Sequence, residues 1–123
     1  MINVNKVLGE ISDYFSPSVI GEIEDMYVKV AKIKGDDIPW HSHENEDELF
    51  YIIKGELLME IESKEAFVMR EGDMQVIKKK VRHKVSAQEE CSILLIERKS
   101  TLHTGGVESD ITRTIEEQLR TNI

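Results

Sequence analysis

A succession of short strand-like segments, separated by turn residues, occupies the sequence from residue 19 to residue 97. Apolar and β-branched residues gather there in stretches of about four to eight, the usual length of a β-strand. Turn-forming sequences such as Lys54-Gly55-Glu56 and Glu71-Gly72-Asp73 indicate tight connections between antiparallel neighbours. Many short strands at even spacing are typical of an all-β barrel or sandwich. The predicted strands are Val19–Ile23, Met26–Ile33, Glu48–Ile53, Leu57–Ile61, Ala66–Met69, Met74–Ile77, Val81–Val85 and Ser92–Ile96.

Short helical segments are predicted at both ends of the chain. Apolar residues recur at helical spacing from Val4 to Phe15, behind Asn3 as the N-cap. Near the other end, apolar residues stand four apart within Ser109–Arg120, which predicts a second helix. The expected organisation is an N-terminal helical segment over residues 1–18, one barrel over residues 19–104, and a C-terminal segment packed on the barrel over residues 105–123.

Length and charge restrict the partners. A chain of 123 residues has the size of one domain and is large enough to bury a core without disulfides. Cys91 is its single cysteine, so no internal disulfide can form. The formal net charge of -8 repels nucleic acid and anionic membranes, so we expect neither as a partner. No apolar run approaches the ~18 residues of a membrane span, and no secretory signal precedes the helix, so we expect a cytoplasmic protein.

Four residues of metal-ligating type are spaced so that they converge. His41 and His43 stand two apart, so on a strand both face the same side. Glu48 follows five positions later, which is the wrong parity for one uninterrupted strand, and residues 44–47 are therefore expected to form an irregular turn. His83 stands in the apolar row of a predicted strand. Three imidazoles and one carboxylate suit iron, manganese, nickel, copper or zinc, so the sequence predicts one divalent transition metal per chain.

These residues resemble the motifs of the cupin superfamily. The first motif is complete, whereas the second keeps Gly72 and His83 but has Lys78, Lys80 and Ala87 where the family usually has proline, glycine and asparagine. Because neither lysine has the fixed φ of proline or the freedom of glycine, we expect a reshaped turn before His83. The resemblance spans about residues 19–97 and implies a double-stranded β-helix, the jelly-roll barrel of the cupins, with ligands lining its mouth and commonly a homodimer. The first motif comprises Gly35, His41, His43, Glu48 and Gly55.

Three functions remain open, because this fold supports many activities. The first is an enzyme in which positions left open on the metal take a small-molecule substrate, for isomerisation of a sugar-type compound or for dioxygenase-type oxidation. The second is a non-catalytic module that binds or senses a small ligand, and the third is a purely structural site. A general acid or base beside the ligands would favour the enzyme. The sequence identifies none, because the inward neighbours Phe50, Ile52, Val81 and Val85 are apolar and the strands carrying Glu60, Arg70 and Gln75 cannot be placed.

The remaining prominent residues have simpler interpretations. Trp40 is expected in packing or at a dimer surface, with a substrate platform as the alternative. The run 78–80 is expected to be a solvated turn, with an anion-binding lip as the alternative. Cys91 is expected to be buried, and His103 has no assigned role.

Apolar residues on both faces of Leu49–Ile53 and Ile93–Ile96 predict a homodimer, unless the N-terminal segment covers part of that surface. The methionines expected in the core are Met59, Met69 and Met74.

Overall fold

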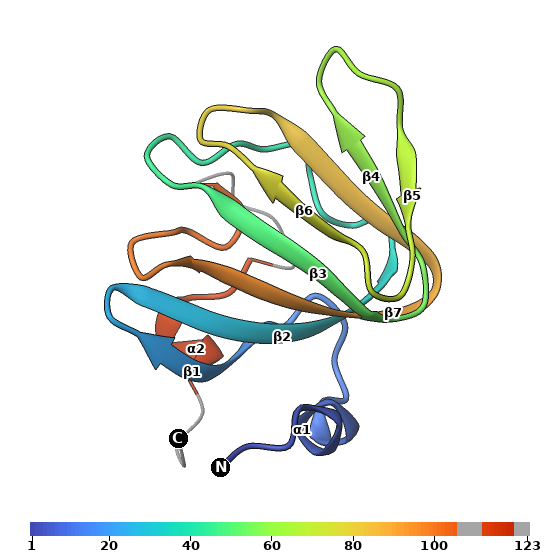
Figure 1. The fold of residues 1–123 in the computed structure, drawn as a ribbon. Coiled ribbons are helices and arrows are strands. Elements are labelled where there is room, and N and C mark those ends of the chain that lie inside the picture. Colours follow the sequence, from blue (N-terminus) through green and yellow to red (C-terminus); the bar gives the residue numbers. More distant parts are fainter. Residues whose placement is uncertain (106–111, 120–123) are drawn as a thin grey trace.

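The structure is a computed structural model and describes residues 1–105 and 112–119 (Figure 1). Within these residues the chain forms two short helices and seven strands, each antiparallel to its strand neighbours. The predicted all-β fold is confirmed. The helices are α1 (Val4–Glu10) and α2 (Ile115–Gln118), and the strands are β1 (Ser18–Ile23), β2 (Met26–Gly35), β3 (Glu48–Lys54), β4 (Leu57–Ile61), β5 (Phe67–Met69), β6 (Met74–Ile77) and β7 (His83–Arg98).

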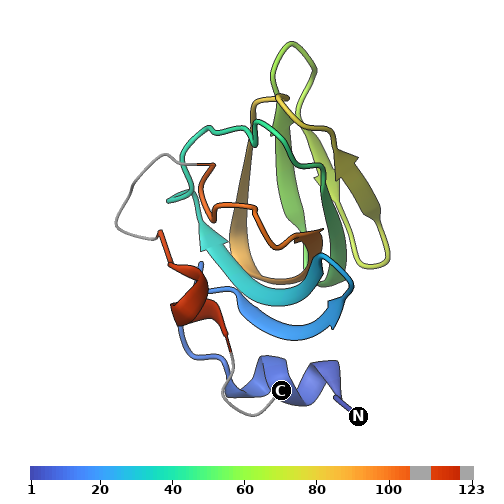
Figure 2. The ribbon, with the colours of Figure 1, turned by 90° about the vertical axis from the view of Figure 1, so that its left-hand side faces the viewer.

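Strand β7 holds the barrel together. Its first residues pair with β4, where His83 lies opposite Ile61. After a bend, its second half lies between β2 and β3 in the order β1-β2-β7-β3-β6, while β5 pairs with β4. The side view in Figure 2 shows the strands curving around a common interior, as in a jelly-roll barrel. Two of the predicted metal ligands, Glu48 and His83, are the first residues of β3 and β7.

Two predicted strands, Val81–Val85 and Ser92–Ile96, are in fact parts of this one strand. The polar residues 88–90 between them are exposed and form the bend of β7. They resemble a loop in the sequence because their side chains face solvent, yet the backbone continues as a strand through them.

The interior of the barrel is apolar because inward and outward residues alternate along each strand. On β4, for example, Leu57, Met59 and Ile61 are buried and the residues between them are partly exposed. Cys91 and Met69 are also buried, as predicted, whereas Met74 is 56% exposed and its predicted place in the core is wrong. Met74 points outward because its neighbour Gln75, not Met74 itself, lies opposite the buried Phe50.

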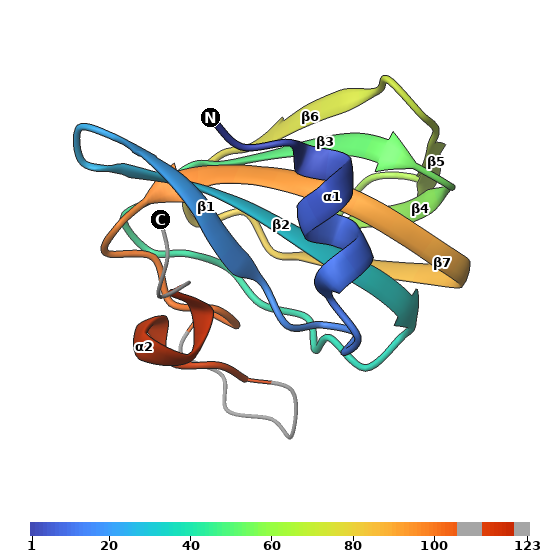
Figure 3. The same cartoon turned by 90° about the horizontal axis from the view of Figure 1, so that it is seen from below.

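Helix α1 packs on the outside of the barrel. Its buried residues Val7 and Leu8 contact a cluster that includes Ile20 of β1, Val30 of β2 and Leu94 of β7. Figure 3 shows α1 lying across the face formed by these strands. The N-terminal segment therefore covers part of the outward apolar surface, which was one of the two ways in which the sequence could account for that surface.

Both helices are shorter than predicted. α1 has the expected N-cap, since Asn3 accepts a hydrogen bond from the amide of Lys6, but it ends at Glu10 instead of continuing to Phe15. Gly9 and the Ser12-Asp13 pair are weak helix formers, and the chain beyond them leads Phe15 into the core in a left-handed conformation with φ 56°. α2 spans four residues behind a Thr114 capping box, and residues 109–111 and 120 of the predicted helix lie outside the described residues. In the part of the chain that the structure describes, neither helix is long and apolar enough to cross a membrane.

Candidate metal centre

The loop between β2 and β3 carries His41 and His43, and it is held by backbone hydrogen bonds and not by a regular strand. The amide of His41 donates to the carbonyl oxygen of His83 at 3.1 Å, and the amide of His83 donates back to His41 at 2.9 Å. The amide of Lys80 donates to the carbonyl oxygen of His43 at 2.7 Å. His41 therefore pairs with the first residue of β7 through a single bridge, and the turn before β7 holds His43 through Lys80.

The turn before His83 has a lysine, Lys80, where the cupin motif has a glycine. Lys80 takes a left-handed conformation with φ 69°, which is the conformation that a glycine adopts most easily. A lysine in this conformation carries local backbone strain. In this conformation the Lys80 amide donates its hydrogen bond to the carbonyl oxygen of His43, which ties the turn to the loop that carries His41 and His43.

The structure brings the four predicted ligand residues together. All four side chains are buried, and one donor atom from each lies within 4.8 Å of the others. Glu48 Oε1 is 3.5 Å from His43 Nε2 and 3.4 Å from His83 Nε2. Two donor atoms bound to one ion at about 2.1 Å lie roughly 3 to 4 Å apart, so these separations suit a shared cation.

Two of the imidazoles are oriented by backbone carbonyls. His41 Nδ1 lies 2.8 Å from the carbonyl oxygen of Pro39, and His83 Nδ1 lies 3.0 Å from that of Val81. A carbonyl only accepts, so each Nδ1 carries the proton and each Nε2 keeps its lone pair. Histidines that ligate metals are commonly held in this way.

Several polar atoms at the centre have no hydrogen-bond partner within the part of the chain that the structure describes. They are Nδ1 and Nε2 of His43, Oε1 of Glu48 and Nε2 of His83, and all are buried. Leaving a buried polar atom unpaired costs about 1–3 kcal/mol, so such a concentration in one place calls for a common partner. A divalent transition metal satisfies nitrogen and carboxylate donors together, and these residues therefore fit one.

The protonation of the centre also favours a metal. Burial lowers the pKa of His41 to about 4, so the ring stays neutral and able to donate its lone pair at neutral pH. Burial by itself would raise the pKa of Glu48, but the polar side chains of Glu97, His43 and His83 beside it outweigh burial and hold the pKa well below its usual range. A neutral His41 and an ionised Glu48 are the forms in which these two groups bind a metal.

A second buried carboxylate, Glu97, adjoins the centre. It lies directly opposite Glu48 in the pairing of β7 with β3. Burial and the charge of Glu48 raise the pKa of Glu97 well above its usual range, although the Lys29 ammonium, 2.7 Å away, acts in the other direction. Lys29 is itself 1% exposed and donates to the side chain of Gln118. A chain of buried polar groups thus runs from the metal centre to the C-terminal segment.

Sequence reasoning missed Glu97, although a signal for it was present. Cys91, Ile93 and Leu95 alternate as the buried residues of β7, and Glu97 continues that alternation. The predicted strand ended at Ile96 and so stopped one residue short.

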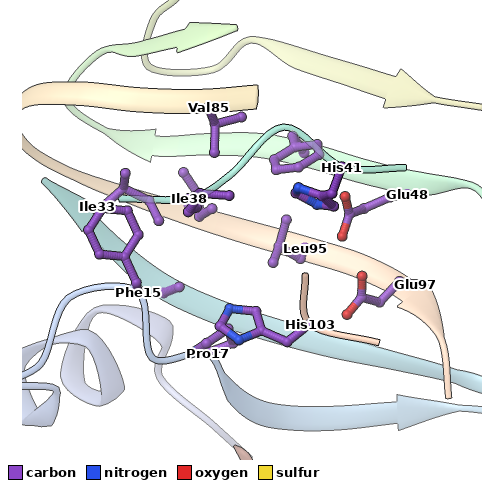
Figure 4. A pocket seen from close by; sticks show the side chains of 13 residues that line it. Phe15, Pro17, Ile33, Ile38, His41, Glu48, Val85, Leu95, Glu97 and His103 are labelled. Atoms are coloured by element: carbon purple, nitrogen blue, oxygen red, sulfur yellow. The ribbon is translucent and has the colours of Figure 1, made fainter. Parts of the chain in front are cut away.

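The cavity beside the centre has one polar end. It holds about 40 Å³ and is lined mainly by apolar side chains, together with His41, Glu48, Glu97 and His103. In Figure 4, Phe15 and Ile33 lie at one end and His41, Glu48 and Glu97 at the other, while His103 reaches the cavity from the side opposite His41. His103 had no predicted role, and burial with the charges of Lys29 and Arg113 lowers its pKa to about 4.

Phe50 and Val85, two of the predicted inward neighbours, line this cavity, whereas Trp40 and the lysine run 78–80 do not. Trp40 is 37% exposed and packs against the Arg82 guanidinium, which lies 5.8 Å from its ring centroid. Lys78 pairs with Asp47 at 2.8 Å, and the Lys79 amide donates to the same carboxylate, so the lysine run is an exposed turn tied to an acidic residue. Neither Glu60, Arg70 nor Gln75 lines the cavity.

Comparisons with known proteins agree with the geometry. The family model of the cupin domain matches residues 30–97 of this chain. YdbB of Bacillus subtilis (strain 168) is 30% identical over 99 residues, which cover 80% of this chain and 87% of YdbB. A cupin-2 domain containing protein from Shewanella frigidimarina NCIMB 400 superposes with a TM-score of 0.77 at 35% identity, over 80% of this chain and 95% of that one. Protein NMB1881 from Neisseria meningitidis superposes with a TM-score of 0.73 at 28% identity, over 80% of this chain and 99% of NMB1881. With more than half of its length matched and the jelly-roll topology in place, the chain belongs to the cupin family.

Proposed function

We propose that this cupin is a metal-dependent enzyme acting on a small oxygen-bearing molecule, with His41, His43, Glu48 and His83 as the metal ligands. One contact carries the proposal. Nε2 of His83 keeps a lone pair because its Nδ1 donates to Val81, yet it faces Glu48 Oε1 at 3.4 Å. Two buried acceptors that face each other need a cation between them, and the neighbouring histidines supply the remaining donors for a metal.

A divalent transition metal held there supplies Lewis-acid or oxygen-dependent chemistry. The protein contributes orientation and exclusion of water. Carbonyl oxygens of Pro39 and Val81 fix two imidazole rings, and the apolar cavity walls lower the local dielectric, which strengthens electrostatic interactions with a bound substrate.

An enzyme is favoured over a binding module because proton-transfer groups line the same cavity. Glu97 has a raised pKa and abuts Glu48, so it is suited to hold a proton at neutral pH and to deliver it to a substrate oxygen. His103 offers a second polar group on another wall. A module that only binds its ligand has no need of a proton donor at this position.

The size of the cavity favours a substrate smaller than a sugar. The cavity is small, at about 40 Å³, so a compact molecule fits it more readily than a sugar does. Of the two chemistries considered, this supports action on a compact acid, ketone or diketone more than isomerisation of a hexose.

A substrate screen tests the proposal. Short hydroxy acids, oxo acids and diketones are offered with and without oxygen to protein that has been stripped of metal and reloaded with Fe²⁺, Mn²⁺, Ni²⁺ or Zn²⁺. Turnover is expected only after reloading. A Glu97→Gln variant is expected to keep its metal and to lose about 100-fold or more in kcat, the usual contribution of a general acid.

The screen also separates the alternatives. Full turnover by stripped protein contradicts the metal-dependent mechanism. Tight binding of one of these compounds by reloaded protein without any turnover favours the ligand-binding or sensor function instead.

A further inference from the structure

We propose that His103 positions the ligand of this centre: its Nε2–H donates a hydrogen bond to a small anionic oxygen ligand, such as a short carboxylate, that also binds the metal. The inference rests on the proposed function, since it needs the metal centre of His41, His43, Glu48 and His83.

The tautomer of His103 is fixed by the backbone. The amide N–H of Arg113 donates to His103 Nδ1 at 2.8 Å. A backbone N–H can only donate, so His103 Nδ1 accepts and carries no proton. The proton of the neutral imidazole therefore lies on Nε2. His103 is therefore a hydrogen-bond donor at its outer nitrogen, in contrast to His41 and His83, whose Nε2 atoms keep lone pairs for a metal.

This donor is available to the cavity. The His103 side chain lines it, on the side opposite His41 (Figure 4). Within residues 1–105 and 112–119, no protein group forms a hydrogen bond with His103 Nε2. Partial burial beside apolar walls makes an unused donor costly, so a ligand that accepts from it gains accordingly.

The segment that carries His103 is packed against the loop that carries the ligands. Gly105 has a φ of 62°, and a Cβ built on it would lie 2.2 Å from the carbonyl oxygen of Ser42 and 3.2 Å from the ring of His41. Thr104, which precedes it, is 1% exposed. This close approach holds His103 at a fixed place relative to His41 and His43, as a positioning residue requires.

The buried charges favour an anion. Glu48 and Glu97 are the two carboxylates that line the cavity, and the Lys29 ammonium lies 2.7 Å from Glu97. Whether Glu97 is protonated, as in the proposed function, or ionised, a divalent metal together with Lys29 outweighs the carboxylates, so the site has net positive charge and attracts a monoanion. A short carboxylate has a single negative charge and is small enough for a cavity of about 40 Å³. One of its oxygens can bind the metal while the other accepts the hydrogen bond from His103.

Acetate and Co²⁺ are suitable probes. Protein is loaded with Co²⁺, and acetate binding is followed by the change in visible absorption of the metal. His103→Asn keeps an oxygen acceptor for the Arg113 amide but has no donor that reaches the cavity, whereas His103→Gln places an amide nitrogen where Nε2 stood. We expect Co²⁺ affinity within about twofold in all three proteins. We expect acetate affinity to fall about tenfold in His103→Asn and to recover largely in His103→Gln.

A second measurement does not depend on the variants folding. In Zn²⁺-loaded wild type labelled with ¹⁵N-histidine, the Nε2–H signal of His103 is expected to shift on addition of acetate and not of chloride.

The outcomes separate the two proposals. Equal acetate affinity in wild type and His103→Asn, no acetate binding by wild type, or an unchanged Nε2–H signal at saturating acetate overturns the role of His103 and leaves the metal centre intact. A wild type that binds no Co²⁺ overturns the proposed function, and the inference with it.

Discussion

Single residues at the candidate metal centre have pKa values that differ from those in water. His41 is the clearest case, since burial lowers its pKa from 6.5 to about 4. Without metal, a neutral His41 ring carries a cost at acidic pH, because the unfolded chain takes up a proton that the folded chain excludes. The shift of His41 corresponds to at most about 3 kcal/mol.

The stability of the metal-free protein is therefore expected to depend on pH in a defined window. Well above pH 6.5 the histidine is neutral in both the folded and the unfolded state, and no effect arises. As the pH falls toward 4, the unfolded state binds more protons, so the free energy of unfolding decreases. Urea unfolding of metal-free protein at several pH values, in wild type and in His41→Asn, measures this.

The comparison with the variant isolates His41, because other groups titrate in the same window in both proteins. The asparagine introduced by His41→Asn retains an amide donor for the Pro39 carbonyl but has no titratable ring. The decrease between pH 6.5 and pH 4 is expected to be shallower in the variant by about 1–3 kcal/mol. Parallel curves would show that His41 is not desolvated in the folded protein.

At the scale of elements, β3 and β6 leave an apolar outer face uncovered. Tyr51 lies opposite Met74 and Leu49 lies opposite Val76, and Tyr51, Met74 and Val76 are 39%, 56% and 39% exposed. Helix α1 covers the corresponding face of β1, β2 and β7 instead. We propose that a second copy of the chain covers the face of β3 and β6, which gives a homodimer.

Light scattering after size exclusion at micromolar concentration checks this assembly. Wild type is expected to elute as a dimer, and Met74→Glu as a monomer, because a buried unpaired carboxylate is unfavourable at an apolar interface. Val68→Glu, at an exposed apolar position on β5, is the matched control and is expected to remain a dimer. A monomeric wild type contradicts the proposal, as does a Met74→Glu dimer of undiminished stability.

The elements themselves were largely predictable from the sequence. Alternating burial and glycine-containing turns located most strands, because each strand has one face in the core. The errors arose where a local signal had a non-local meaning. Residues 88–90 look like a loop in the sequence but form a bend in β7. Lys80 looks unsuited to a tight turn but is held in one by the hydrogen bond from its amide to the carbonyl oxygen of His43.

At the scale of the whole molecule, the sequence indicated which residues converge but not what surrounds them. The four candidate ligands follow from spacing and motif, whereas Glu97 and His103 reach the cavity through pairing and packing over long sequence distances. Glu97 meets Glu48 only because β7 and β3 pair in that register. His103 depends on the tight packing of Gly105 against Ser42, which no local pattern reveals.

The most direct test of the account is the metal content of purified protein, measured by elemental analysis together with X-ray absorption. Wild type and Glu44→Gln, which alters an exposed carboxylate four residues before Glu48, are expected to bind about one divalent transition metal per chain with bonds of roughly 2.0–2.3 Å to nitrogen and oxygen. A His41→Ala, His43→Ala double variant is expected to remain folded and nearly metal-free. Full occupancy in that double variant would contradict the assignment of the centre.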